Sequence, residues 1–194
     1  MSQIELREES LSQLSDYAKL SIRFTVASVL TLHQTDDQLS GFPLTETGIE
    51  NPYEKDYDAI PGNHPTEWVK RFDVSQWGMI CAYHEQNRIG GAIIAHNTKS
   101  VHMLEERAEL AVLWDLRVAG AWRGNGVGKR LFDAAEAWAK QRDCHWLKIE
   151  TQNNNVAACR FYARCGCVLG AIHRFAYPEY PEEIQLLWYK SLEE

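Results

Sequence analysis

The chain has 194 residues, 45% of them hydrophobic, and a formal net charge of -7 at pH 7. This size allows one compact domain with a full core, and no run of about eighteen apolar residues is available to cross a membrane. The acidic balance argues against nucleic acid, which binds to basic surfaces. Residues 1–9 are polar and lack the apolar core of a signal peptide, so we expect a single cytoplasmic domain over 1–194.

The patterns of apolar residues predict an α+β order of elements. Residues 10–20 and 66–72 fit short helices, and 21–32 fits a strand because apolar residues alternate there. Two runs, 77–83 and 90–97, fit a hairpin around 84–88. The second half is predicted to follow the order strand 108–118, helix 127–142, strand 146–151, helix 155–165, and two strands near 167–177 and 184–191.

The cysteines give no sign of a disulfide framework or a metal site. They stand at 81, 144, 159, 165 and 167, which is an odd number without a C-x-x-C pair. The seven histidines show no metal-ligand spacing. We therefore expect no metal, and thiols that are reduced and mostly buried.

The stretch 34–65 is rich in Gly, Pro, Asn and Asp and has no sustained period, so it is predicted to be a long loop. Between Asp36 and Asp58 it carries seven acidic residues and one lysine, with Tyr53 and Tyr57 interleaved. Such a loop attracts a cationic amine through charge and aromatic contact. An acidic loop that only solubilises the protein would have the same composition.

A glycine-rich segment, Arg123-Gly124-Asn125-Gly126-Val127-Gly128-Lys129, joins a predicted strand to a predicted helix. Glycines let a phosphate approach the backbone, and the first N–H groups of a helix have no partner inside it. The helix dipole adds partial positive charge at the same place. From Arg117 to Arg130 there are four basic residues and no acidic one. The segment therefore predicts a site for a small phosphorylated ligand.

Two common phosphate-loop patterns fail on this segment. A P-loop would need Gly at 123 and Ser or Thr at 130, but Arg stands at both positions. A dinucleotide-binding loop would need its third Gly at 129, which is Lys. The pattern Arg/Gln-x-x-Gly-x-Gly/Ala is satisfied by Arg123, Gly126 and Gly128. In this it resembles the acetyl-CoA loop of the GNAT N-acetyltransferase superfamily.

A second segment strengthens the resemblance. Asn155, Ala158, Phe161, Tyr162 and Gly166 match the GNAT pattern Asn-x-x-Ala-x-x-Phe/Leu-Tyr-x-x-x-Gly. The two motifs occur in the order and spacing of that superfamily, and the similarity covers about residues 109–167. The run 150–162 and the pair at 188–189 are also similar to streptothricin acetyltransferases.

The resemblance implies a fold and a cofactor. The fold is a GNAT-like α/β three-layer arrangement, with a central mixed sheet of six to seven strands flanked by helices and splayed between its fourth and fifth strands. The acetyl-CoA core would lie at about 108–177 and the acceptor loop at about 34–65. Acetyl-CoA is the implied acetyl donor. Its implied binding residues are Leu116, Arg117, Val118, Arg123, Gly124, Asn125, Gly126, Val127, Gly128, Lys129, Asn155, Ala158 and Tyr162.

Transfer of an acetyl group to an amine requires a base for the amine and an acid for the departing thiolate. The GNAT pattern implies Tyr162 as the acid, since a phenol holds its proton at neutral pH; packing on the sheet is the alternative role. Asp115 is our first choice of base, acting through water, because it lies nearest the expected acetyl carbon. Glu109 and Glu150 are alternatives, as is a water chain without a single base. A period of two would put Glu109 and Asp115 on one strand face.

The expected reaction is direct attack by a primary amine in a ternary complex. The acidic stretch favours a cationic small molecule, such as streptothricin, an aminoglycoside or a polyamine, and an antibiotic acceptor would imply a role in resistance. A protein or peptide acceptor and a non-catalytic CoA-binding domain stay open. We expect no nucleic acid or membrane partner, and a monomer or homodimer. The candidate acceptor-binding residues are Asp56, Tyr57, Asp58, Trp114 and Glu150.

Overall fold

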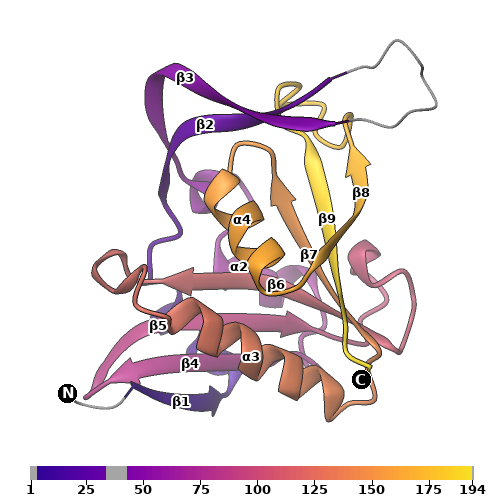
Figure 1. The fold of residues 1–194 in the computed structure, drawn as a ribbon. Coiled ribbons are helices and arrows are strands. Elements are labelled where there is room, and N and C mark those ends of the chain that lie inside the picture. The colour runs from indigo at the N-terminus through magenta and orange to yellow at the C-terminus, as the bar shows by residue number, and fades with distance from the viewer. Residues whose placement is uncertain (1–3, 34–42, 194) are drawn as a thin grey trace. The chain divides into compact units, whose positions relative to one another are not determined.

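The computed structural model describes residues 4–33 and 43–193 (Figure 1). Its strands are β1 (Ile4–Glu9), β2 (Phe24–Leu32), β3 (Leu44–Lys55), β4 (Gly78–His84), β5 (Asn87–Ala95), β6 (Leu110–Val118), β7 (Trp146–Gln152), β8 (Val168–His173) and β9 (Gln185–Ser191). Its α-helices are α1 (Leu14–Tyr17), α2 (Pro65–Arg71), α3 (Val127–Lys140) and α4 (Val156–Arg164). Short 3₁₀ turns are η1 (Leu11–Gln13), η2 (Tyr57–Ala59), η3 (His102–Leu104) and η4 (Gly120–Trp122).

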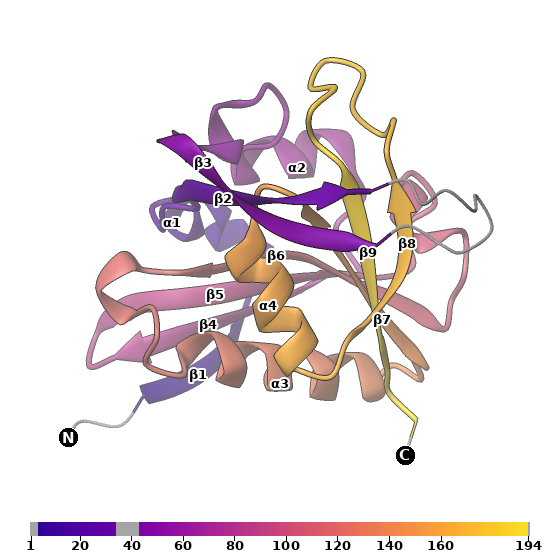
Figure 2. The same cartoon turned by 45° about the horizontal axis from the view of Figure 1, so that its top comes forward.

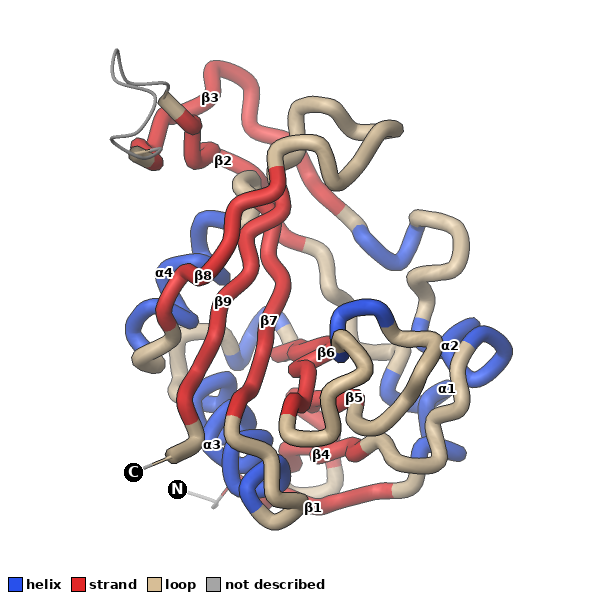
Figure 3. The backbone as a smooth tube through the Cα atoms, turned by 90° about the vertical axis from the view of Figure 1, so that its right-hand side faces the viewer, coloured by secondary structure: helices blue, strands red, loops and turns tan. Residues whose placement is uncertain are grey.

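Seven of the strands form one mixed sheet in the order β1-β4-β5-β6-β7-β9-β8, and β2 pairs with β3 in a second sheet. The pairs β1–β4, β4–β5 and β5–β6 are antiparallel, whereas β6–β7 is parallel. Figure 3 shows β7, β9 and β8 side by side. The expected mixed sheet of six to seven strands is therefore confirmed.

Strands β6 and β7 are the fourth and fifth of this order, where the splay was expected. Their pairing runs from Leu110↔Trp146 to Leu113↔Ile149, whereas β6 continues to Val118. The last residues of β6 are thus hydrogen-bonded to β5 on one edge and lie beyond the pairing with β7 on the other.

A β-bulge in β6 begins where this pairing ends. Ile93 lies opposite Asp115 and Ile94 opposite Leu113, so Trp114 has no opposing residue on β5. An extra residue reverses the alternation of side chains along the strand. Glu109, moreover, lies in the turn before β6. The expectation that Glu109 and Asp115 share a strand face is therefore wrong.

The contacts divide the chain into two units. Unit 1 comprises Met1–Ile22, Asp56–Ile149 and Tyr189–Glu194, and unit 2 comprises Arg23–Lys55 and Glu150–Trp188. The expectations of one domain over 1–194, a cytoplasmic location and a monomer or homodimer stay predictions. None of the helices in 4–33 and 43–193 is long and apolar enough to span a membrane.

In unit 1, helices cover both faces of β4, β5 and β6. Helix α3 lies on one face, and α1 and α2 lie on the other (Figure 3). Glycines allow this close approach: a Cβ on Gly78 would lie 2.4 Å from Trp138 of α3, and one on Gly91 would lie 2.6 Å from Tyr17 of α1. The core on the α1 side consists of Leu14, Tyr17, Trp68, Trp77, Met79, Cys81, Ile93, Ala95, Val101, Leu104 and Val112.

In unit 2, β2 and β3 form an antiparallel ribbon (Figure 2). The prediction of a long loop at 34–65 is wrong for residues 44–55, because those residues form β3. Most side chains of β3 are exposed, so the strand has no apolar period to predict it, and its order comes from backbone pairing with β2. Residues 34–42 lie outside the described part. The edge strand β1 was not predicted either, since charged residues interrupt its apolar alternation.

The contact of Gly91 with Tyr17 gives a test of the unit 1 core. We expect Gly91→Ala to lower the free energy of unfolding by about 1–3 kcal/mol, because the added methyl group overpacks a fully buried contact. Urea denaturation measures this loss. Gly48→Ala is the matched control, since a Cβ there meets no atom within 4 Å of the described residues. Equal stability of the two variants would contradict the packing described.

Candidate active site

The glycine-rich segment forms a tight entry into α3. Gly124 and Gly126 have φ values of 78° and 79°, in the left-handed region that favours glycine. Gly126 is the N-cap of α3, so the first turn begins without a side-chain cap. A Cβ built on either glycine would meet no atom within 4 Å among the described residues. The segment therefore leaves open space over the first N–H groups of a 14-residue helix.

Basic side chains surround this entry. The Nε atom of Arg123 donates to the Val118 carbonyl at 3.0 Å, which ties the segment to the end of β6. Lys129 forms an ion pair with Asp133 one turn further along α3, and Arg130 donates to the Ile4 carbonyl at 2.9 Å. Val127 is buried and anchors the first turn in the core. The predicted binding of a pyrophosphate to this segment stays a prediction, which the open backbone and the basic side chains support.

A buried ion-pair cluster lies at the end of β6 in unit 1. The Arg117 side chain is fully buried and donates to both Asp115 oxygens, with Nε–Oδ1 at 2.8 Å and Nη2–Oδ2 at 2.7 Å. It also makes a bidentate pair with Asp58, at 2.6 and 2.8 Å, and bonds the Leu20 carbonyl at 3.1 Å. The Tyr17 hydroxyl donates to Asp115 Oδ1 at 2.6 Å. One cation thus holds two carboxylates.

The charges in this cluster are fixed by their neighbours. Burial lowers the pKa of the Arg117 guanidinium, but Asp115 and Asp58 raise it by more, so Arg117 keeps its proton. Burial and the nearby Asp115 raise the pKa of the Tyr17 hydroxyl, which therefore stays a donor. Both oxygens of Asp115 are already bonded to Arg117 or Tyr17. This arrangement favours a structural role for Asp115 over that of a base.

The other predicted acceptor residues of unit 1 lie close to this cluster in the chain. Asp56 caps η2, its Oδ1 accepting from the Asp58 N–H at 3.1 Å, and Tyr57 is half-buried at the start of η2. Trp114 points into the aromatic core, with ring centroids 5.3 Å from Phe72 and from Trp77. Asp58 is engaged by Arg117, so its charge is largely compensated inside the protein.

Carboxylates of the acidic stretch in unit 2 are also engaged. Glu46 forms an ion pair with Arg160 and accepts from Ser28, and Glu54 accepts from the Thr25 hydroxyl at 2.6 Å. Asp36 and Asp37 lie outside the described residues. Two carboxylates of the acidic stretch, Glu46 and Glu54, therefore bond β3 to neighbouring segments of unit 2.

The second motif builds the start and face of α4 in unit 2. The Asn155 Oδ1 accepts from the Ala158 N–H at 3.1 Å and caps the helix. Tyr162 is buried on α4, with its ring edge-on to Phe161 at a centroid distance of 5.1 Å. Asn155 thus has a structural role as the helix cap, and its predicted contact with acetyl-CoA stays a prediction.

Glu150 lies in unit 2, immediately after the last residue of β7 that pairs with β6. Its Oε1 accepts from the Tyr177 hydroxyl at 2.6 Å and from Gln152 at 3.1 Å, and its Oε2 accepts from Gln185 at 2.8 Å. Glu150 was predicted from the sequence as a site residue, whereas Tyr177 and Gln185 were not. Neither residue belongs to a motif, and Tyr177 lies in the loop between β8 and β9, so no periodic signal marks it.

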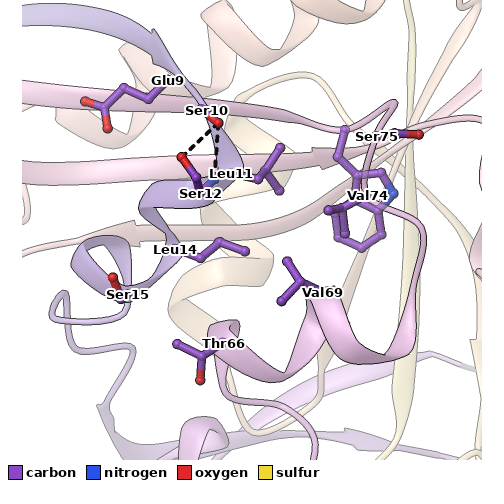
Figure 4. A pocket seen from close by; sticks show the side chains of 11 residues that line it. Glu9, Ser10, Leu11, Ser12, Leu14, Ser15, Thr66, Val69, Val74 and Ser75 are labelled. Atoms are coloured by element: carbon purple, nitrogen blue, oxygen red, sulfur yellow. Dashed lines mark hydrogen bonds between the residues drawn. The ribbon is translucent and has the colours of Figure 1, made fainter.

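A groove in unit 1 has a different character (Figure 4). Hydroxyl and apolar side chains line it, together with one charged residue, Glu9, which forms an ion pair with Arg88. Its lining residues are Glu9, Ser10, Leu11, Ser12, Leu14, Ser15, Thr66, Val69, Val74, Ser75 and Trp77. A groove without a basic side chain does not fit a pyrophosphate.

No group of three or more His, Cys, Asp or Glu side chains within 4–33 and 43–193 is placed to hold a metal ion. The five cysteines are free and buried, as expected. Burial raises the pKa of the Cys81 thiol to about 12 and that of Cys144 to about 11, so neither resembles a reactive thiolate.

The engagement of Asp58 by Arg117 can be tested directly. We expect Asp58→Asn to lower the free energy of unfolding by about 1–3 kcal/mol. Both oxygens of the Asp58 carboxylate accept from the buried guanidinium, whereas the amide of asparagine has only one acceptor oxygen. Urea denaturation measures the loss, with Glu50→Gln on the exposed side of β3 as the control. If Asp58→Asn matched the control in stability, the ion pair would not have the structural role assigned to it.

Comparison with known proteins agrees with this geometry. The model of the acetyltransferase (GNAT) family matches residues 47–167. A streptothricin acetyltransferase of Escherichia coli is 30% identical over 180 residues, covering 91% of this chain and 90% of the relative. Streptothricin acetyltransferase A of Bacillus subtilis (strain 168) is 35% identical over 149 residues, covering 75% and 77%.

A solved structure is similar over nearly the whole chain. It is that of a candidate streptothricin acetyltransferase from Bacillus anthracis str. Ames in complex with acetyl coenzyme A. The two chains are 26% identical, with a TM-score of 0.74 and coverage of 97% of this chain and 99% of the other. The chain therefore belongs to the GNAT family of acetyltransferases, enzymes whose acetyl donor is acetyl-CoA.

Proposed function

We propose that this enzyme acetylates a primary amine of a cationic small molecule of the streptothricin class, by direct attack in a ternary complex. The proposed class of acceptor is supported by the similarity to the Escherichia coli streptothricin acetyltransferase, which covers 91% of this chain. The alignment thus extends well beyond the motifs for acetyl-CoA, into segments that can select the acceptor. Antibiotic resistance would be the biological outcome.

The proposed acetyl-CoA site uses the backbone more than side chains. The pyrophosphate binds to residues 123–129 at the start of α3, where glycines leave open space and the helix dipole is positive. Leu116, Arg117 and Val118 offer backbone groups on the edge of β6 that lies beyond its pairing with β7. Asn155, Ala158 and Tyr162 complete the set. When bound, acetyl-CoA supplies the thioester carbonyl carbon that the amine attacks.

Two side chains move protons in this proposal. Glu150 binds the ammonium group of the acceptor and takes its proton, which leaves an electron pair to form the new C–N bond. Tyr162 gives its proton to the sulfur as the C–S bond breaks. Glu150 replaces Asp115 as the base because its carboxylate bonds only neutral donors among the described residues, whereas Asp115 is paired with Arg117.

The role of Tyr162 is tested by Tyr162→Phe. We expect kcat to fall by about 10²–10⁴, the usual contribution of a general acid, with little change in the Kd of acetyl-CoA. Steady-state kinetics and calorimetry measure the two quantities. Tyr53→Phe, which removes a hydroxyl from an exposed tyrosine of unit 2, is the matched control. An unchanged kcat in Tyr162→Phe would leave Tyr162 with a packing role only.

The phosphate site is tested at Gly126. We expect Gly126→Val to raise the Kd of acetyl-CoA by about tenfold or more, since a left-handed residue with a Cβ costs about 1–2 kcal/mol and shifts the first N–H groups. Gly120→Ala is the control, because a Cβ there meets nothing within 4 Å in the described part of the chain. Equal affinities in both variants would place the phosphates elsewhere.

The function as a whole is tested by thiol release from acetyl-CoA with streptothricin, aminoglycosides, polyamines and Lys-bearing peptides as acceptors. We expect the highest kcat/KM with streptothricin. Turnover with peptides alone would support the protein-acetyltransferase alternative. Tight binding of acetyl-CoA without turnover on any amine would support a CoA-binding domain without catalysis.

A further inference from the structure

The carboxylate of Glu150 is held by an asymmetric set of donors in unit 2. Oε1 receives two hydrogen bonds, from the Tyr177 hydroxyl and the Gln152 amide, while Oε2 receives one, from Gln185. An ionised carboxylate offers about four acceptor positions, two on each oxygen. Oε1 is thus filled, and Oε2 keeps one position for a further donor.

Tyr177 is itself locked in this arrangement. Its hydroxyl accepts from the Gln152 amide at 2.8 Å, so its one proton is directed to Glu150 Oε1 at 2.6 Å. Burial raises the pKa of the Tyr177 hydroxyl, and the neighbouring Glu150 raises it further, so the phenol remains a donor at working pH. The three groups form a closed triangle that fixes the rotation of the carboxylate.

The Glu150 carboxylate has only neutral hydrogen-bond donors among the described residues. No Lys or Arg in the described ranges forms an ion pair with Glu150. A second acidic group that acts on Tyr177, after Glu150, is Glu183, and that carboxylate is paired with Lys55. Lys55 in turn lies 4.5 Å from the ring centroid of Tyr180. Lys55 is therefore engaged by other groups, and the Glu150 carboxylate has no ion-pair partner among the described residues.

We propose that Tyr177 is a positioning residue that fixes Glu150 Oε1, so that Oε2 receives the acceptor ammonium and takes its proton. This inference rests on the proposed role of Glu150 as base. The hydrogen bonds of Tyr177 and Gln152 prevent the two oxygens from exchanging places, and Gln185 orients Oε2 from its other side. The proton passes from the ammonium nitrogen to Oε2, and the freed electron pair attacks the acetyl carbon.

The test is Tyr177→Phe, which removes one hydroxyl and keeps the ring. We expect kcat/KM for streptothricin to fall by about tenfold or more, the worth of a hydrogen bond to a charged group. The acidic limb of the kcat/KM–pH profile should move to higher pH, because the Glu150 anion loses a donor. The KM of acetyl-CoA should stay near wild type. Tyr180→Phe, in the same loop, is the matched control.

Glu150→Gln separates this inference from the proposed function. Full activity in Glu150→Gln would overturn the role of Glu150 and the inference with it. A large loss in Glu150→Gln, together with a wild-type pH profile in Tyr177→Phe, would overturn the inference alone. In the double variant, Tyr177→Phe should cause no further loss of kcat/KM, because both changes act on one proton transfer. Additive losses would show that Tyr177 acts independently of Glu150.

Discussion

The organisation of unit 1 depends on the hydrogen bonds and ion pairs of the buried Arg117 guanidinium. This guanidinium bonds Asp115 on its own strand, Asp58 in η2 and the Leu20 carbonyl after α1. Taking an arginine out of water is costly unless every donor finds an acceptor, and removing one partner leaves a charge uncompensated. The cluster therefore fixes the segment 56–59 and the end of α1 to the strand whose backbone is proposed to receive acetyl-CoA.

Two candidate carboxylates of the chain have different surroundings, each within its own unit. Asp115 has the Arg117 guanidinium beside it and the Tyr17 hydroxyl on one of its oxygens, so both of its oxygens are engaged inside the protein. Glu150 has only neutral donors among the described residues, and one oxygen has an open position. This difference in environment is the reason that Glu150, rather than Asp115, is proposed as the base. The bulge at Trp114 lies at the end of the β6–β7 pairing, so it sets where the open edge of β6 begins.

The sequence allowed the elements of the second half and the acetyl-CoA motifs to be predicted, because each of these signals is local. Arg123, Gly126 and Gly128 are close in the chain, and their spacing alone indicates a turn that leads into a helix. The Asp58–Arg117 pair joins residues 59 positions apart, and Tyr177 meets Glu150 across 27 positions, so no local pattern contains them. Strand β3 was missed for a related reason, since its order depends on pairing with β2 rather than on an apolar face.

A crystal structure of the enzyme with coenzyme A and streptothricin bound would test the proposed sites of both molecules most directly. We expect the pyrophosphate to contact the N–H groups of residues 124–128, and an amine nitrogen of streptothricin to lie within hydrogen-bond distance of Glu150 Oε2. We also expect Tyr177 still to bond Glu150 Oε1. A reactive amine placed against Asp115 or Asp58, with Glu150 distant from it, would contradict these proposals.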